Sequence, residues 1–295
     1  MPIQEVSPNA MKAEEKLLGF ITLLLTGASR FSHLLYVGNP EIIKSFFGLK
    51  RLPLAGTTLT RYFNKIKTWA QAEQISEGIW NYLKPIIDWA AIGADWLSFD
   101  STVVTRYGNQ EGAKKGRASH HPLVAFLNGS RIVLNIWNRS GDTSSGNNII
   151  SFFECVYQRI WGLIQIKGVL ADAGFYSEAF IESIEEKKID YIITAKLYPT
   201  LQRKIYAHDN WSQIEPGLWI SEFQFQHHNW KNSHRYVVVR QSIKKRKKAL
   251  GKQLRLFEIE TESYRYGVWI TNSTEHALSV WRTIRQRSND ENTIK

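Results

Sequence analysis

Two aspartates stand where short apolar runs give way to polar turns. Asp100 closes the run WLSFD, and Asp172 follows an apolar run at 166–170 within the sequence Ala-Asp-Ala-Gly. Carboxylate oxygens suit Mg²⁺, and two such ions about 4 Å apart cleave a phosphodiester by activating the attacking oxygen and stabilising the leaving one. The two side chains are therefore candidate ligands for metal-dependent phosphodiester chemistry.

Each aspartate taken singly has a plainer interpretation, because acidic residues at strand ends commonly cap helices or close turns. The candidate site requires that the two strands be neighbours in one sheet. Both carboxylates would then converge at the edge where open α/β sheets bind ligands.

Residues 96–195 have the pattern of an α/β domain. The runs WLSFD, LVAFL and RIVLNIW predict three sequential strands, closed by glycines at 129 and 141. A helix at 147–162, a strand at 166–170, a helix at 177–188 and a strand at 191–195 follow. We expect a mixed sheet with flanking helices in a catalytic domain that covers residues 93–295.

The first 92 residues predict a separate helical domain. Apolar residues recur at helical spacing in 13–25 and 71–91, and Asn39-Pro40 has the composition of a helix start. Within this domain the segment 57–67 carries three basic side chains, Arg61, Lys65 and Lys67. A helix that contacts DNA is one interpretation of this segment, and a solvated basic face is the plainer one.

Residues 196–265 interrupt the α/β pattern with aromatic-rich alternation, which predicts a β-rich insertion. The insertion holds 14 Lys plus Arg against 6 Asp plus Glu, so most of the whole-chain charge of +11 lies here. A basic surplus favours a polyanionic partner, because counterion release from phosphates drives binding. An apolar strand at 266–271 and a helix from about Glu275 follow the insertion.

Several side chains are candidates for contact with DNA phosphates or bases. Each has a structural alternative. The lysines and arginines could instead lie in a solvated loop or turn. The tryptophan could stack on an unpaired base or pack in the core. Core packing is the favoured interpretation of the tryptophan, since its strand is apolar throughout. The candidates are Lys114, Lys115, Arg117, Lys244, Lys245, Arg246, Lys247, Lys248, Trp269 and Arg285.

The composition narrows the cellular setting. A single cysteine, Cys155, excludes an internal disulfide framework and fits a reducing compartment. The longest apolar run, at 17–25, is about half of what a membrane span needs. The histidine pairs at 120–121 and 227–228 lack the spacing of a zinc site. We expect a cytoplasmic protein with no membrane contact and no structural zinc, associated with the nucleoid if its polyanionic partner is DNA.

Three segments resemble the DDE transposases of bacterial insertion sequences: DSTVVTRYGNQEGAKKGRASHHPLVAFL from Asp100, ADAGFYSEAF around Asp172, and VWITNS followed by RQRSNDENTIK. The similarity spans about residue 50 to the last residue. It implies a ribonuclease-H-like fold in which Asp100, Asp172 and Glu291 bind two Mg²⁺ ions, with Mn²⁺ able to substitute. Glu291 belongs to the family signature Tyr-x2-Arg-x3-Glu-x6-Lys, which places its arginine at Arg287.

The same resemblance implies the reaction and the partners. Mg²⁺-dependent hydrolysis frees a 3′-hydroxyl at the element's end, and this hydroxyl attacks another phosphodiester in strand transfer. Arg287 neutralises phosphate charge during the reaction. The expected partners are double-stranded DNA, as element ends and target, and a second subunit in a homodimer at synapsis.

Two positions depart from the family signature. Ile284 stands where the signature has tyrosine, and the signature lysine would fall at position 298, beyond the last residue of the sequence. We therefore expect a C-terminally truncated copy. One alternative is a catalytically inert protein that only occupies DNA, and another is a nuclease that acts on RNA–DNA hybrids, which the basic insertion disfavours.

Overall fold

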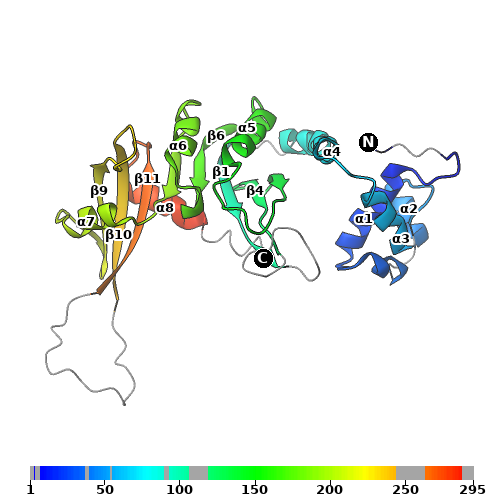
Figure 1. The fold of residues 1–295 in the computed structure, drawn as a ribbon, viewed down its shortest axis with the longest axis horizontal. Coiled ribbons are helices and arrows are strands. Elements are labelled where there is room, and N and C mark those ends of the chain that lie inside the picture. Colours follow the sequence, from blue (N-terminus) through cyan, green and yellow to red (C-terminus); the bar gives the residue numbers. More distant parts are fainter. Residues whose placement is uncertain are drawn as a thin grey trace, which may run out of the picture. The chain divides into compact units, whose positions relative to one another are not determined.

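The computed structural model describes residues 3, 7–36, 40–53, 55–89, 93–105, 119–243 and 263–287. The chain divides into two compact units, Met1–Ala90 and Ala91–Lys295 (Figure 1). Within the described residues, no helix combines the length and the apolar character needed to cross a bilayer.

The first unit is helical in its described part. Its core joins Leu23, Leu34 and Leu59, and the ring of Phe63 lies 4.9 Å from that of Phe20. Its helices are α1 (Ala13–Leu25), the 3-10 helix η1 (Phe31–Tyr36), α2 (Pro40–Phe47), α3 (Gly56–Phe63) and α4 (Trp69–Trp89). The start at Pro40 and the span of α1 are those expected from the sequence.

The basic segment of this unit is shorter as a helix than its sequence suggests. The helix α3 ends at Phe63, so Arg61 lies exposed on the helix while Lys65 and Lys67 follow its end. The three basic side chains therefore do not form one helical face.

One sheet runs through the second unit. In the described part of the chain it has nine strands in the order β5-β4-β1-β6-β7-β11-β10-β9-β8. The bounds are β1 (Ala94–Ser101), β4 (Leu123–Leu127), β5 (Val133–Trp137), β6 (Gln165–Ala171), β7 (Tyr191–Thr194), β8 (Ser212–Glu215), β9 (Leu218–Phe225), β10 (His234–Ile243) and β11 (Ser263–Thr271). A separate pair joins β2 (Val104–Thr105) to β3 (Ser119–His120).

The first five strands have the ribonuclease-H-like arrangement. The strands β5, β4 and β1 pair antiparallel, whereas β6 pairs parallel to β1 and β7 parallel to β6. The strand β1 lies between β4 and β6, so Leu97 and Phe99 are fully buried. The expected mixed sheet with flanking helices is confirmed.

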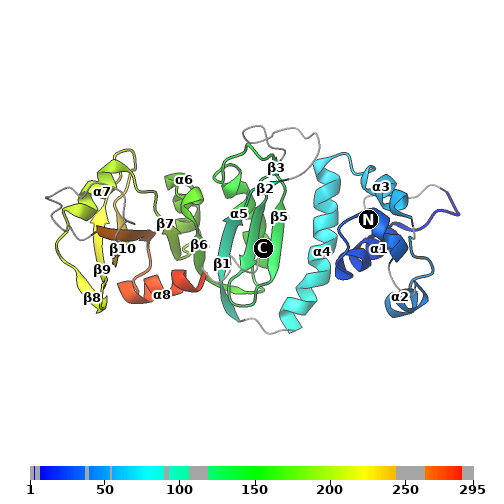
Figure 2. The same cartoon turned by 90° about the horizontal axis from the view of Figure 1, so that it is seen from below.

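Helices cover both faces of this sheet, and Figure 2 shows α6 and α8 on opposite sides of β6 and β7. On one face, the ring of Phe99 lies about 6 Å from the rings of Phe152, Phe153 and Phe180. Each such buried ring contributes about 1.5–3 kcal/mol of hydrophobic stabilisation. The helices are α5 (Ile149–Ile160), α6 (Glu178–Glu185), α7 (Pro199–Tyr206) and α8 (Ala277–Arg287).

The strands of the predicted insertion extend the core sheet. β11 pairs with β7 on one side and with β10 on the other, so β8, β9 and β10 continue the same hydrogen-bonded ladder. This pairing covers the edge of β7, which would otherwise present unpaired backbone groups. The strands β8, β9 and β10 are therefore part of one continuous sheet with β7.

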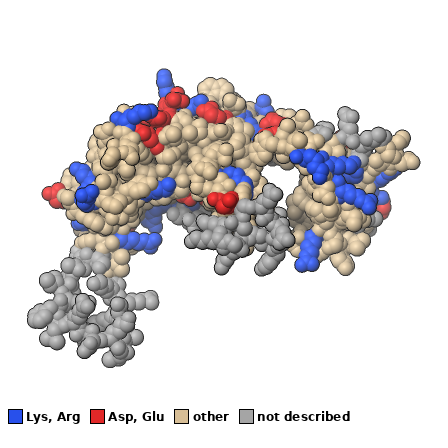
Figure 3. Space-filling view, viewed as in Figure 1, with Lys and Arg blue, Asp and Glu red and all other residues tan. Residues whose placement is uncertain are grey.

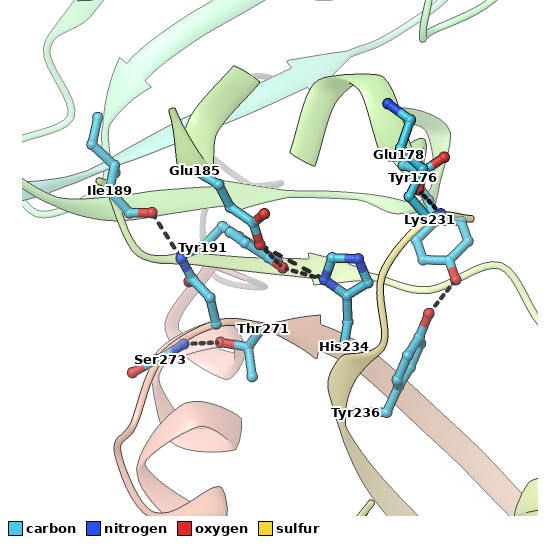
Figure 4. Close-up of polar contacts among 11 residues, drawn as sticks. Tyr176, Glu178, Glu185, Ile189, Tyr191, Lys231, His234, Tyr236, Thr271 and Ser273 are labelled. Carbon is cyan, nitrogen blue, oxygen red and sulfur yellow. Dashed lines mark hydrogen bonds and ion pairs between the residues drawn. The ribbon is translucent and has the colours of Figure 1, made fainter. Parts of the chain in front are cut away.

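A buried polar network fixes the β9–β10 hairpin to α6 (Figure 4). The Tyr191 hydroxyl donates to Glu185 Oε1 at 2.9 Å and lies 3.2 Å from His234 Nδ1. The hydroxyls of Tyr176 and Tyr236 meet at 2.6 Å, and burial raises the pKa of Tyr176 to about 12. Burial also lowers the pKa of His234, against the opposing charge of Glu185. Neutral rings and hydroxyls therefore connect the extended half of the sheet to its core.

Candidate active site

The two candidate aspartates lie at adjacent strand ends. Phe99 pairs with Ala171 in the parallel register of β1 and β6, and the residue that follows each of them along the chain is an aspartate. Asp100 and Asp172 therefore share the carboxyl edge of two neighbouring parallel strands. The Asp100 side chain is mostly buried but keeps 19% of its surface exposed to solvent.

Local backbone geometry orients Asp172. The residue caps the 3-10 turn η2 (Ala173–Phe175), and Gly174 N donates to Asp172 Oδ1 at 2.7 Å. A Cβ atom at Gly174 would lie 2.9 Å from that oxygen and 2.7 Å from Ser145 Cβ. The turn thus requires glycine beside the carboxylate. The capping role and a ligand role are compatible, because a carboxylate has two oxygens.

Arg287 brings a positive charge to the pair from α8. Its Nη2 atom donates to the Phe99 carbonyl at 2.9 Å and lies 3.8 Å from Asp100 Oδ1. Its Nε atom is buried and has no hydrogen-bond partner among the described residues. Trp281 and Ile284, both buried against the sheet, hold this end of α8 in place. The arginine is therefore fixed against the carboxylates by core packing.

The electrostatics of the pair favour a bound cation. Burial raises the pKa of Asp172 above its ordinary value, and the nearby Asp100 charge raises it further. The Arg287 charge and the Gly174 amide oppose these effects. Two carboxylates with one guanidinium leave a surplus of negative charge, which a divalent cation would neutralise.

Asp95 shows the contrasting use of an acidic residue on the same strand. Its carboxylate accepts hydrogen bonds from Gly129 N at 2.9 Å and from Ser130 N at 3.1 Å. These bonds close the turn between β4 and β5. Asp95 lies at the opposite end of β1 from Asp100 and has a structural role.

Arg139 forms part of the site's wall, a role that its sequence context did not indicate. The guanidinium donates to Ser101 Oγ at 3.1 Å, to the His121 carbonyl at 2.9 Å and to the Asn147 carbonyl at 2.6 Å. Burial lowers its pKa. It thereby ties the residue after Asp100 to the segment that precedes α5. An arginine that follows a strand has no distinguishing sequence signal, since its partners come from three separate segments.

The donors at this site fit a hard divalent cation. Asp100 and Asp172 offer carboxylate oxygens, the ligand type that Mg²⁺ and Mn²⁺ prefer. In the described part of the chain no group of three or more His, Cys, Asp or Glu side chains is arranged to hold a metal ion. The predicted third ligand, Glu291, lies outside the described residues.

Two of the remaining predicted residues fall within the described structure. Trp269 is half-buried in β11 and packs against the core cluster under α8, and its ring lies across Gly267, where a Cβ atom would come within 2.5 Å of the indole. This placement favours the core-packing interpretation. Arg285 is exposed on α8, with its guanidinium 4.8 Å from the centre of the Trp281 ring. Outside the described residues lie Lys114, Lys115, Arg117, Lys244, Lys245, Arg246, Lys247 and Lys248.

The sequence matches a known family over most of its length. Residues 51–295 match the model of the family described as transposase DDE domain group 1. The chain belongs to this DDE transposase family. The matched range includes Asp100, Asp172 and Glu291 and the whole extended sheet. A comparison with curated proteins finds no match for this DDE family member.

Solved structures similar to this DDE chain are transposase–DNA assemblies of low sequence identity. The piggyBac transposase synaptic complex with hairpin DNA matches 98% of this chain at 8% identity, with a TM-score of 0.47. The Mos1 transposase paired-end complex with the left transposon end matches 65% of this chain at 7% identity, with a TM-score of 0.26. The match covers 61% of each of those two proteins.

Proposed function

We propose that this DDE family protein cleaves DNA at the ends of a mobile element and transfers the freed strand to target DNA. The observation that carries the proposal is the placement of Asp100 and Asp172 side by side at the carboxyl edge of two parallel strands. Arg287 lies against them, and one family model covers all of these positions.

The reaction would have two displacements at phosphorus. In the first, a water oxygen bonds to phosphorus, the bond to the 3′-oxygen breaks, and that oxygen leaves as a hydroxyl after taking a proton. In the second, this 3′-hydroxyl loses its proton and bonds to a phosphorus of the target, whose own 3′-oxygen departs. Asp100, Asp172 and Glu291 would hold two Mg²⁺ or Mn²⁺ ions, which when bound supply activation of the attacking oxygen and stabilisation of the leaving one.

The protein's own groups have separate tasks. The Gly174 amide keeps the Asp172 carboxylate oriented, and Arg139 fixes the segments beside the pair. The Arg287 guanidinium, set against Asp100, would stabilise negative charge that grows on the phosphate oxygens. A rigid support of this kind is what a metal site on strand ends requires.

Basic side chains on the surface of the second unit support DNA as the partner. In Figure 3 acidic side chains gather at the top of the second unit with basic side chains beside them, and further basic side chains lie at its lower left, over the extended strands. Double-stranded DNA is the proposed partner, with a homodimer forming when two element ends are paired.

The test is cleavage by the full chain of a plasmid that carries the DNA flanking its gene, with Mg²⁺ or Mn²⁺. Asp100→Asn and Asp172→Asn should each abolish nicking at the element's ends. Asp190→Asn is the matched control, because Asp190 is exposed before β7 and away from the site. Nicking that persists in both site variants would refute the proposal. Wild-type binding to the ends without any nicking would indicate an inert protein that only occupies DNA.

A further inference from the structure

A second cationic feature of the same unit lies away from the carboxylates, where Arg240 on β10 is surrounded by aromatic rings. Its guanidinium carbon lies 4.3 Å from the centre of the Trp211 ring, 4.7 Å from that of Tyr264 and 5.2 Å from that of Trp219. Distances under about 6 Å are typical of cation–π attraction. The rings therefore fix the guanidinium in place.

This cluster forms a surface and not a core. Trp211, Trp219 and Arg240 are each only partly buried. The cluster continues to Tyr266, whose ring lies 6.3 Å from that of Trp211. It ends at Tyr206, which is 66% exposed and whose ring lies 5.5 Å from that of Tyr266. Large aromatic side chains usually lie in protein cores. A group of them that is partly exposed to solvent around one charged side chain is typical of a binding surface.

The hydrogen-bonding capacity of Arg240 is incompletely used. Its Nε atom is buried and has no hydrogen-bond partner within the described structure. Ring faces attract a cation but do not accept all five of its in-plane N–H groups. Arg240 also hydrogen-bonds the side chain of Tyr266. The arginine is only partly buried, so an anion can approach its charge from solvent.

The sheet topology places this surface toward the same edge as the catalytic carboxylates. β10 is antiparallel to β11, β11 is antiparallel to β7, and β7 is parallel to β6, so β10 runs in the direction of β6. In Figure 1 the ends of β10 and β11 extend past α8 toward the bottom of the view. Arg240 is three strands away from Asp172 across the sheet, because β7 and β11 lie between β6 and β10. It also lies about three residues further along the strand direction, which gives a distance of roughly 15–20 Å. A DNA strand held at the carboxylates would cover that span within roughly five or six nucleotides.

The geometry points to a site for unpaired nucleotides of a DNA strand, in which bases stack on the rings around Arg240 and the guanidinium contacts a phosphate. Base stacking on aromatic side chains contributes about 1–3 kcal/mol per base, whereas the bases of an intact duplex are already stacked on each other. This inference rests on the proposed DNA chemistry, since a strand whose end has been cleaved can supply unpaired nucleotides near the carboxylates.

The first test measures the binding of a fluorescein-labelled oligothymidine by anisotropy, with EDTA present so that no cleavage occurs. Tyr206→Ala should weaken binding roughly five-fold or more, the loss expected for one stacked base. The matched control is Trp161→Ala, because Trp161 is an equally exposed aromatic residue outside the cluster, at 70%. Binding to a duplex of the same sequence should be unchanged in both variants.

The second test separates charge from stacking through the salt dependence of binding. Arg240→Gln should reduce the slope of log K against log salt by about 0.7, the value for one phosphate contact on a single strand. Arg240→Lys should keep that slope but weaken binding, because a lysine is a compact point charge that stacks poorly on rings. Lys167→Gln is the matched control, since Lys167 is exposed near the opposite end of β6.

Two outcomes would overturn the inference. One is oligothymidine binding by Tyr206→Ala that equals the wild type. The other is an equal loss of single-strand and duplex binding, which would make the surface a duplex contact. Both can occur while nicking still depends on Asp100 and Asp172, so failure here is distinguishable from failure of the proposed cleavage. Because Tyr206 is exposed, its variant stays informative even if the Arg240 variants do not fold.

Discussion

Replacing Arg287 by methionine should make the site bind divalent metal more tightly, although the folded protein loses stability. The guanidinium lies 3.8 Å from Asp100 Oδ1 and lowers the pKa of Asp172, so it supplies the charge that a metal ion would otherwise provide. A divalent ion about 6 Å from a unit positive charge is repelled by about 1.4 kcal/mol in a solvent-like dielectric. Removal of that charge should therefore lower the Kd for Mn²⁺ roughly ten-fold.

The same pair sets the stability cost of this substitution. At 3.8 Å, opposite unit charges attract by about 1 kcal/mol in water and about 4 kcal/mol at an effective dielectric of about 20. Both side chains are mostly buried, at 17% and 19% exposure, which places the pair between these limits. We expect a loss of about 2 kcal/mol, or roughly 4–8 °C in the melting temperature of a unit of this size, in the absence of metal.

The assay is calorimetric titration with Mn²⁺, together with thermal unfolding with and without the ion. Addition of Mn²⁺ should raise the melting temperature more in Arg287→Met than in the wild type. Arg287→Lys keeps the charge and should bind Mn²⁺ nearly as the wild type does. Arg282→Met, exposed on the same helix, is the control for loss of a basic residue. Weaker Mn²⁺ binding by Arg287→Met would refute the electrostatic reasoning.

Three further variants test other parts of the account. Burial raises the pKa of Asp172 above its ordinary value of 3.8, so the carboxyl group stays protonated to higher pH in the folded state than in the unfolded chain. The stability of the folded state therefore falls as the pH rises from 3.8 through the raised pKa. The asparagine of Asp172→Asn cannot ionise, so the melting temperature of this variant should rise relative to that of the wild type between acid and neutral pH. A difference in melting temperature that does not change with pH would contradict this prediction. Gly174→Ala, whose Cβ atom would lie 2.9 Å from Asp172 Oδ1 and 2.7 Å from Ser145 Cβ, should weaken Mn²⁺ binding, slow nicking and lower the melting temperature. If calorimetry finds the wild-type Mn²⁺ affinity in this variant, the close approach is unimportant. Trp281→Ala should cost about 3–5 kcal/mol in denaturant unfolding, because it removes a large buried ring from the contact between α8 and the sheet. A cost below about 1 kcal/mol would show that α8 is held by other contacts.

Much of the fold follows from local sequence pattern. Helical spacing and a terminal Pro40 predict α1 and the start of α2, and apolar runs predict β1, β4, β5, β6 and β7. These elements are recognisable because periodicity and turn residues are properties of neighbouring positions. The strand order then follows from the ribonuclease-H-like succession of elements.

Features that depend on contacts between residues far apart in the sequence are harder to predict. Continuity of the sheet through β11 is a matter of pairing between Trp269 and Thr194, which no local pattern encodes. The helix predicted at 177–188 is shorter in the structure, where α6 spans Glu178–Glu185 and the Ser177 side chain makes no capping hydrogen bond. Arg139 and Arg240 gain their partners from segments far along the chain, so their roles appear only in three dimensions.

The candidate site was predicted in outline from its residue types. Asp100 and Asp172 were selected because each ends a strand, and the parallel register of β1 and β6 places them side by side. The contact of Arg287 with the Phe99 carbonyl could not be predicted, because it depends on how α8 packs across the sheet. The ligand role of all three carboxylates stays a prediction.

The central claim is that Asp100 and Asp172 are shared ligands of divalent metal in this DDE family protein. Electron paramagnetic resonance of Mn²⁺ titrated into the full chain measures this directly, because free and bound ions have different signals. The account predicts that the wild type and Asp190→Asn bind Mn²⁺, and that Asp100→Asn and Asp172→Asn each lose most of that binding. If both site variants bind Mn²⁺ as well as the wild type does, the central claim is wrong.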